Sequence, residues 1–176
     1  MNETEIGQAI QMLGFTYASY KITTASGTKQ INNIPAGENA GNHLKNAESF
    51  TQQKGVVGGH NSSNFYEKLD EVGGRVVLEK THPAISGVKE VQYEIPKKGI
   101  DGQPRIPPEY KIIGKPKTVY DSNIISDKQI YEWGQEAMKN GVIDSNGTII
   151  GFSKNGLKFV GHMKDGIITN FYPVLD

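Results

Sequence analysis

Two turn signals near the end of the chain place the tightest limits on its fold. Asn155-Gly156 and Asp165-Gly166 each separate two runs of residues with strand character. Asn-Gly and Asp-Gly pairs favour the tight turns that join neighbouring antiparallel strands. The tail therefore predicts a three-stranded antiparallel meander over residues 148–153, 157–163 and 167–174.

A helix is predicted before this meander. Ser126 is a good N-cap residue, and Gln129 three positions later completes a capping-box pattern. Apolar residues then recur at helical spacing until Asn140-Gly141, a pair that favours a helix end. The side chains expected to face the core are those of Ile130, Trp133, Ala137 and Met138.

The middle of the chain predicts one more helix and two strands. Ser62 or Ser63 can cap a short helix that ends at Gly73-Gly74. Residues 75–78 and 88–95 have the composition and alternation of strands. The residues expected on the inner face of the helix are Phe65, Leu69 and Val72.

The N-terminal part predicts helices joined by irregular chain. Apolar residues on one helical face favour a short helix over residues 5–13, and Asn39 can cap a second helix that runs to about Gln53. Residues 15–37 between them are rich in Thr, Ser, Asn and Gly, which favours a loop with a little strand. His43, on the second helix, is predicted to be a surface residue.

These elements predict an α+β protein. We expect an N-terminal helical or linker subdomain over residues 1–54, followed over residues 55–176 by an antiparallel-sheet core with one well-defined packed helix. The chain has 176 residues and no cysteine, so it can bury a core but has no thiolate or disulfide chemistry. We expect no membrane span and no signal peptide. Its formal net charge is zero, so a polyanionic ligand would have to meet a local basic surface.

Gly58-Gly59-His60 is the first candidate functional motif. Two glycines leave no side chain to block a ligand that approaches the imidazole. The helix predicted just after them would place His60 near a helix start, where anions are favoured. A phosphate site is one interpretation of this triplet, and an ordinary turn beside a surface histidine is the other.

His82 and a basic segment are the next candidates. Pro83 restricts His82 to an extended or turn conformation, which gives the histidine a fixed direction, although a loop residue bonded to a backbone carbonyl is an equal interpretation. Between residues 97 and 117, six basic residues stand against two acids and are interrupted by four prolines. This pattern favours a stiff basic loop able to bind a phosphate backbone, with an ordinary solvated hairpin loop as the alternative. The basic residues are Lys97, Lys98, Arg105, Lys111, Lys115 and Lys117.

The order of these motifs resembles that of the bacterial EndoU ribonucleases. Gly-Gly-His is followed by a second histidine, then by Lys-Thr-Val-Tyr-Asp and Ile-Ile-Ser-Asp-Lys-Gln-Ile, and last by Ile-Thr-Asn-Phe-Tyr-Pro at residues 168–173. More narrowly, the chain is similar to the EndoU-like toxin domains at the C-termini of CdiA proteins, which act in contact-dependent growth inhibition. The resemblance covers residues 55–175.

The resemblance implies a His-His-Lys catalytic triad, which corresponds here to His60, His82 and Lys117. It also implies that His60 is the general acid and His82 the general base. Thr169 and Tyr172 correspond to a hydroxyl residue and an aromatic residue that line the substrate pocket, with the register on this strand open by one residue. The alternatives are Arg75 or His162 for His82, and Lys115 for Lys117. The other basic residues between positions 97 and 117 are expected to bind substrate.

These residue types suit RNA cleavage through the substrate's own 2′-hydroxyl. A base must take the hydroxyl proton, an acid must protonate the leaving 5′-oxygen, and a cation must stabilise the charge on the phosphate. Imidazole suits both proton transfers because its unperturbed pKa is about 6.5. No metal or other cofactor is required, and DNA, which lacks the 2′-hydroxyl, is not expected to be cut.

The resemblance implies an antibacterial toxin that cleaves RNA, with tRNA as the expected substrate and a cognate immunity protein as the partner. It implies secretion or cell-surface presentation as part of a larger protein, and action in the cytoplasm of the target bacterium. The alternative function is a non-catalytic polyanion-binding or adhesion module, in which the basic segment holds the ligand and the histidines are incidental.

Overall fold

The structure is a computed structural model that describes residues 16–24 and 27–175, with side chains from Ala36 onward. Its residues form two compact units, which we describe one at a time. The first unit combines the described residues up to Gly41 with Tyr131–Tyr172, and the second contains Asn42–Ile130 and the end of the chain from Pro173. The predicted helix over residues 5–13 lies outside the described residues.

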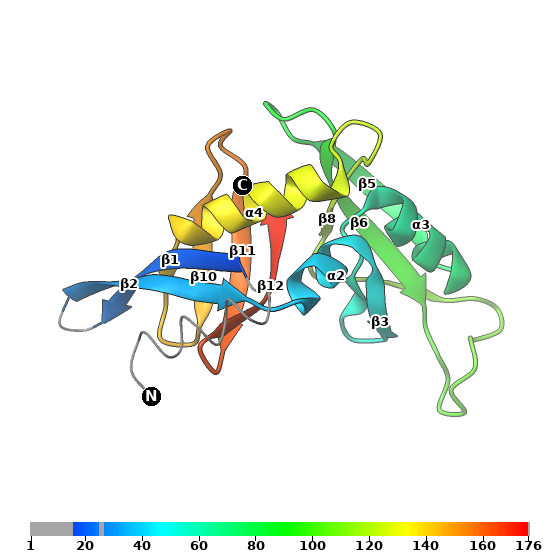
Figure 1. The fold of residues 1–176 in the computed structure, drawn as a ribbon. Helices are drawn as coiled ribbons and strands as arrows, with labels where there is room; N and C mark the ends of the chain where they lie inside the picture. The colour runs from blue at the N-terminus through cyan, green and yellow to red at the C-terminus, as the bar shows by residue number, and fades with distance from the viewer. Residues whose placement is uncertain (1–15, 25–26, 176) are drawn as a thin grey trace. The chain divides into compact units, whose positions relative to one another are not determined.

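The first unit is built on a closed barrel with the strand order β1-β2-β12-β11-β10-β9 (Figure 1). The β1–β2, β9–β10 and β10–β11 pairs are antiparallel, whereas the β1–β9 and β2–β12 pairs are parallel. The fold is therefore α+β, as predicted, with some parallel pairing in addition. The barrel strands are β1 (Thr16–Thr24), β2 (Gly27–Ala36), β9 (Val142–Ile143), β10 (Thr148–Phe152), β11 (Lys158–Lys164) and β12 (Ile167–Val174).

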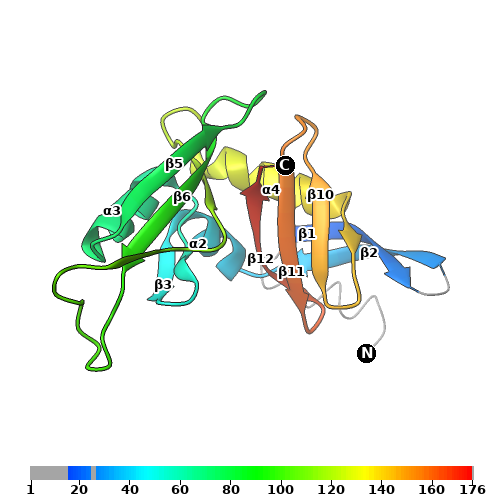
Figure 2. The same ribbon diagram turned by 180° about the vertical axis from the view of Figure 1, so that it is seen from behind.

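The predicted C-terminal meander is confirmed. β10, β11 and β12 follow one another along the chain and lie next to one another in the barrel (Figure 2). Asp165 and Gly166 have φ angles of 53° and 77°, and Gly156 has a φ of 87°. Because tight hairpin turns need positive φ at their central residues, the two dipeptides fix the reversals of the chain.

The helix α4 (Asp127–Lys139) begins where the sequence predicts. The backbone N–H of Gln129 donates to Oγ of Ser126 at 3.1 Å, which confirms the N-cap. Ile130, Ala137 and Met138 are buried as predicted, but Trp133 is only half-buried. Gly134 is the residue that faces the barrel instead, because its missing side chain lets the helix approach the rings of Phe171 and Phe159.

Two predictions for the N-terminal part are wrong. Residues 16–24 and 27–36 form the paired strands β1 and β2 and not a loop with a little strand, because paired Thr, Tyr and Ile residues favour strands once a barrel is available. The helix α2 (Asn39–Lys45) is much shorter than predicted, and residues 47–51 form the strand β3 (Ala47–Thr51) instead. β3 pairs with β4 (Gly55–Gly58), so tertiary pairing overrides the weak local helix signal. No helical subdomain is present among the described residues of this part.

The second unit contains a four-stranded antiparallel sheet with β6 at its centre. The predicted strands at residues 75 and 88 are confirmed, and so is the helix between Asn61 and Gly73, although Asn61 and not Ser62 or Ser63 is its N-cap. Phe65 and Leu69 of this helix are buried against the sheet. The elements are α3 (Ser62–Glu71), β5 (Arg75–Thr81), β6 (Val88–Pro96), β7 (Tyr110–Ile112) and β8 (Lys117–Tyr120).

The predicted boundary after residue 54 falls inside the second unit, in the turn between β3 and β4. The barrel contains strands from the N-terminal segment and from the end of the chain. The first unit therefore consists of two separate stretches of the sequence, and no single boundary divides the chain into the two units. In the part of the chain that the structure describes, no helix is both long enough and apolar enough to cross a membrane.

Candidate active site

Four titratable side chains from separate parts of the sequence meet in the second unit. They come from α2, β3, the residue pair after β4, and the start of β8. The positive charges of Lys117 and His43 both act on His60, and Glu48 acts on Lys117. We call this group the His60 cluster, and its members are His43, Glu48, His60 and Lys117.

The backbone N–H, the backbone carbonyl and one ring nitrogen of His60 are all hydrogen-bonded. Its side chain is buried, with only 4% of the residue exposed. The ring nitrogen Nδ1 lies 2.6 Å from the carbonyl oxygen of Thr118. Because a carbonyl oxygen only accepts, Nδ1 carries the proton, and the basic lone pair of the neutral ring lies on Nε2. The backbone N–H donates to Leu44, and the carbonyl accepts from Tyr120, at 2.8 Å each.

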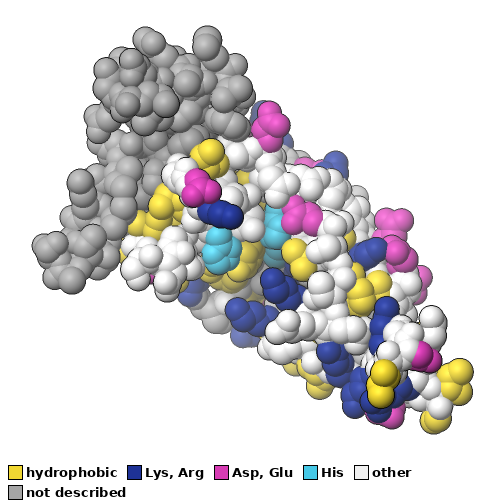
Figure 3. Space-filling view, turned by 90° about the horizontal axis from the view of Figure 1, so that it is seen from below, with side chains coloured by type: hydrophobic (Ala, Val, Ile, Leu, Met, Phe, Trp, Pro, Cys, Tyr) yellow, Lys and Arg dark blue, Asp and Glu magenta, His cyan; other side chains and the backbone are white. Residues whose placement is uncertain are grey.

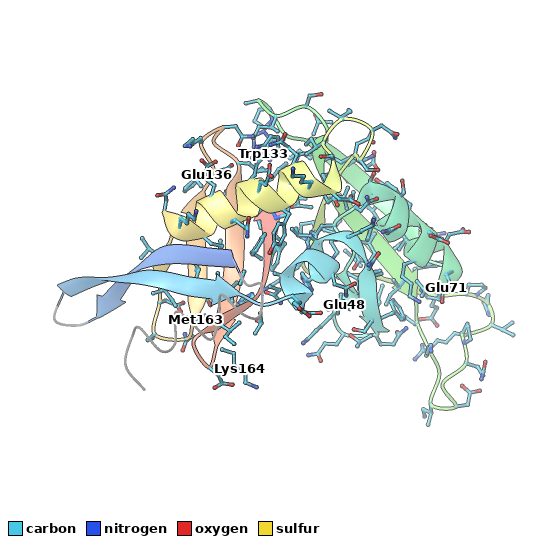
Figure 4. The ribbon with its side chains drawn as sticks, viewed as in Figure 1. Glu48, Glu71, Trp133, Glu136, Met163 and Lys164 are labelled. Atoms are coloured by element: carbon cyan, nitrogen blue, oxygen red, sulfur yellow. The ribbon has the colours of Figure 1, made fainter. Side chains whose placement is uncertain are left out.

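His43 is the second imidazole of the cluster. The prediction that it lies on the surface is wrong, because only 6% of it is exposed. Its ring centroid is 5.6 Å from that of His60, with the two planes at 42°. Nδ1 of His43 lies 2.8 Å from Oε2 of Glu48, which is labelled in Figure 4. An ionised carboxylate only accepts, so Nδ1 donates and Nε2 again carries the lone pair of the neutral ring.

The Gly58-Gly59 pair explains how the two imidazoles meet. Both residues have positive φ, at 68° and 67°. The N–H of Gly59 donates to the carbonyl oxygens of His43 and Asn46, at 3.0 and 2.8 Å. A Cβ atom on Gly58 would lie 2.6 Å from the oxygen of Asn46, so any side chain there would push the chain away from α2. The glycines therefore bring His60 against His43.

Lys117 supplies the positive charge of the cluster. Its Nζ donates to the carbonyl oxygen of Gly58 at 2.7 Å. Burial lowers the pKa of Lys117 to about 8, and the nearby charge of Glu48 opposes this effect. Lys115, the alternative lysine, is exposed before β8 begins. The structure thus brings together Lys117 and His60, two members of the predicted triad.

The environment of His60 favours its neutral form. Burial lowers the pKa of His60 well below its usual value, and the charges of Lys117 and His43 lower it further. The hydrogen bond to Thr118 acts in the opposite direction and does not reverse the shift. The ring is therefore neutral near pH 7, which suits a base more than an acid.

His82 lies in the turn between β5 and β6, where it borders a separate pocket formed by residues 81–89 and Asp121. Its Nδ1 accepts the backbone N–H groups of Ala84 and Ile85 at 3.1 and 3.0 Å. The proton of its neutral ring must then be on Nε2, which leaves no lone pair for a base. The contacts described for this ring lie within its own turn and not with the His60 cluster.

Arg75, one alternative to His82, is the first residue of β5. Its Nε donates to Oε1 of Glu94 at 2.5 Å, and its guanidinium lies 3.8 Å from the centre of the Tyr110 ring. The contacts described for Arg75 are thus with its neighbours on the sheet, Glu94 and Tyr110.

Thr169 and Tyr172 lie on β12 in the first unit, together with His162 on β11. Oγ1 of Thr169 donates to the carbonyl oxygen of His162 at 3.1 Å, and the hydroxyl of Tyr172 is 3.4 Å from Nε2 of the same residue. Phe171 between them is buried. Thr169 and Tyr172 thus share His162 as a neighbour, and their role in a substrate pocket stays a prediction.

The five residues predicted to bind substrate differ in how available their charges are. Lys97 and Arg105 both pair with Glu109, at 3.3 and 3.1 Å. Lys98 and Lys115 are exposed, and Lys111 is half-buried on β7. The surface in Figure 3 likewise shows Lys and Arg side chains next to acidic ones. The segment is therefore less strongly basic than its sequence predicts.

His43 and Glu48 were not among the site residues predicted from the sequence. The available signal was a histidine and a glutamate five residues apart, upstream of the Gly-Gly-His triplet. The predicted helix up to Gln53 was wrong, and it placed Glu48 on the same helix as His43. The contact between these two side chains, on α2 and β3, could therefore not be predicted. Among the described residues, no group of three or more His, Cys, Asp or Glu side chains is arranged to hold a metal ion.

Comparison with known proteins places this chain in a family. The family model for the bacterial EndoU nuclease matches residues 29–175. The chain is 35% identical over 136 residues to a protein of Yersinia mollaretii named tRNA nuclease CdiA. It is 33% identical over 156 residues to a protein of the same name from Escherichia coli.

These matches cover 74% and 82% of this chain but only 4% and 5% of the two relatives, so the chain spans a small part of their length. The match begins at residue 29 and contains His43, Glu48, His60 and Lys117. The chain therefore belongs to the bacterial EndoU nuclease family.

Proposed function

We propose that the protein is an endoribonuclease that cleaves RNA by transesterification at the His60 cluster. One observation carries the proposal: two buried imidazoles have ring centroids 5.6 Å apart, each with Nδ1 bound to an oxygen acceptor, beside a half-buried lysine. This arrangement supplies a base, an acid and a cation without a metal ion.

His60 is the base in this proposal. Its neutral Nε2 takes the proton of the 2′-hydroxyl, the 2′-oxygen attacks phosphorus, and the bond to the 5′-oxygen breaks. His43 donates a proton to that leaving oxygen, and Glu48 balances the charge of the ring while it is protonated. This assignment replaces the expectation that His60 is the acid, because the lowered pKa of His60 favours a base.

Lys117 stabilises the negative charge that builds up on the phosphate oxygens. Thr169 and Tyr172 are proposed to contact the substrate, on the basis of the family resemblance. Lys98, Lys111 and Lys115 are proposed to bind the RNA backbone, while Lys97 and Arg105 do so after exchanging Glu109 for phosphate.

The proposed substrate is tRNA, because both relatives are named tRNA nucleases. Family membership also supports an antibacterial toxin that is delivered as part of a larger protein and acts in the cytoplasm of the target bacterium. A cognate immunity protein is the proposed partner that protects the producing cell.

The test is incubation of tRNA with purified protein in excess EDTA. We expect fragments with 2′,3′-cyclic phosphate and 5′-hydroxyl ends, and no cleavage where the 2′-hydroxyl at the cut site is replaced by hydrogen. Metal-activated water usually leaves 5′-phosphate ends, so such ends or a requirement for Mg²⁺ would reject the mechanism. RNA retained without cleavage would favour the polyanion-binding alternative.

A further inference from the structure

Asp127, the first residue of α4, binds three side chains from three other segments of the second unit. Its Oδ1 accepts from Nδ2 of Asn61 at 3.0 Å and from the hydroxyl of Tyr120 at 2.7 Å. Its Oδ2 pairs with Nζ of Lys45 at 2.9 Å. One carboxylate thus connects the ends of α2 and β8 with the N-cap of α3.

Each of these partners is adjacent to a group that holds His60. Asn61 follows His60 in the chain, and Tyr120 donates its N–H to the carbonyl oxygen of His60 at 2.8 Å. Lys45 follows Leu44, whose carbonyl oxygen accepts from the N–H groups of both His60 and Asn61 at 2.8 and 3.0 Å. Asp127 therefore ties together the backbone segments that surround His60.

Of the contacts that Asp127 makes, those with the buried side chains of Tyr120 and Asn61 contribute most to holding these segments together. Tyr120 is fully buried and Asn61 nearly so, and an unsatisfied buried hydroxyl or amide is destabilising because it has lost its hydrogen bonds to water. The ion pair with Lys45 is half exposed and contributes little. Burial raises the pKa of Asp127, but the hydrogen bonds from Tyr120, Lys45 and Asn61 outweigh it and lower the pKa overall. The carboxylate is therefore charged near neutral pH and accepts from both donors.

We infer that Asp127 is a positioning residue for His60: through Asn61 and Tyr120 it fixes the segment that carries the imidazole and the strand whose Thr118 carbonyl orients the ring. The catalytic consequence of this inference depends on the proposed function. A displacement of about 1 Å at a catalytic group can cost about 100-fold in rate. The position of the ring itself can be observed without RNA.

The experiment compares Asp127→Ala, Asp127→Asn and Glu71→Ala with the wild type. Asn keeps an oxygen that accepts from Tyr120 and Asn61, so it is the conservative variant. Glu71→Ala is the matched control, because it removes a carboxylate whose described contact is an exposed ion pair with Lys68 at 2.8 Å. Glu71 is labelled in Figure 4, at the end of α3. The readouts are kcat and KM on tRNA, the pH–rate profile, and the NMR signal of the hydrogen-bonded Nδ1–H of His60.

For Asp127→Ala we expect kcat to fall about 10–100-fold with KM changed less than threefold. The His60 signal should broaden or shift. The acidic limb of the pH profile should move to higher pH, because water that reaches the ring reduces the effect of burial on the pKa of His60. Asp127→Asn should restore kcat to within about fivefold of wild type, and Glu71→Ala should match wild type in every readout.

A folded Asp127→Ala protein with the wild-type His60 signal and kcat would overturn the inference, as would a loss of stability with no change in either readout. If Asp127→Ala does not fold, Tyr120→Phe takes its place and should change kcat and the His60 signal in the same direction by a smaller amount. An unchanged His60 signal in Tyr120→Phe would also overturn the inference. If the wild type does not cleave RNA, the proposed function fails, while the NMR signal still decides whether Asp127 positions His60.

Discussion

The position of one proton distinguishes the histidines of the second unit. His43 and His60 donate from Nδ1 to oxygen, whereas His82 accepts two backbone N–H groups at the same atom. Only the first two therefore present Nε2 as the proton-accepting atom of the neutral ring. The family resemblance suggested the chemistry, and this side-chain geometry is the reason for proposing His43 and His60 as the histidines that perform it.

Alanine substitutions test this distinction. His43→Ala and His60→Ala should each lower kcat about 100 to 10,000-fold, as expected for the loss of an acid or a base. His82→Ala should remain within a fewfold of wild type, whereas the resemblance-based assignment expects it to be inactive. Cleavage rates of folded variants, checked by circular dichroism, decide between the two assignments. An inactive His82→Ala with an active His43→Ala would restore His82 to the triad.

The two lysines give a second residue-scale prediction. Lys117→Ala should lower kcat much more than RNA affinity, because a contact made in the transition state affects rate more than ground-state binding. Lys115→Ala should instead weaken binding in a salt-dependent way, because its charge is exposed. Single-turnover rates and binding at several salt concentrations separate these effects. Exchanged phenotypes would show that Lys115 is the catalytic lysine.

At the scale of elements, the close approach of the β4 end to α2 depends on Gly58. Gly58→Ala must accept both a positive φ and a Cβ atom 2.6 Å from a backbone oxygen. Gly102→Ala is the control, because Gly102 has a φ of 78° and no atom within 4 Å of the added Cβ. We expect Gly102→Ala to cost about 1–2 kcal/mol of unfolding free energy and Gly58→Ala about 1–3 kcal/mol more.

Urea unfolding measures both variants, and a tRNA cleavage assay under native conditions follows. Gly58→Ala should also lose activity while still folded, since His60 would move away from His43. Equal stability losses for the two variants would show that the contact with α2 is not tight.

At the scale of the whole molecule, the charge states of His60 and Lys117 predict a bell-shaped pH dependence of kcat. The pKa of His60 is lowered, so its basic form is present near neutral pH and is lost only below pH 6.5. The pKa of Lys117 is about 8, so its charge is present below that pH and is lost as the pH rises through it. The acidic limb of the profile should therefore lie below pH 6.5, and the alkaline limb should lie near pH 8.

Lys117→Arg tests the alkaline side of this profile, because a guanidinium remains charged at any pH used here. Relative to its own maximum, this variant should retain more activity above pH 8 than the wild type does. An unchanged alkaline limb would show that Lys117 does not control it.

The sequence by itself determined the elements whose signals are local. The turns at Asn155-Gly156 and Asp165-Gly166, the Ser126 cap and the strand at residue 88 each depend on residues within a few positions of one another. The sequence also determined His60 and Lys117 as site candidates, since both stand in short motifs that resemble the family.

Only the tertiary structure decided the partners of those residues. Pairing with β4 turns residues 47–51 into a strand, and the same pairing brings Glu48 and His43 to His60. Closure of the barrel likewise pairs residues 16–24 and 27–36 as strands, although the Ser, Asn and Gly residues among them favour a loop locally. These contacts join residues far apart in the chain, and their free energy comes from burial and pairing that no local window of sequence contains.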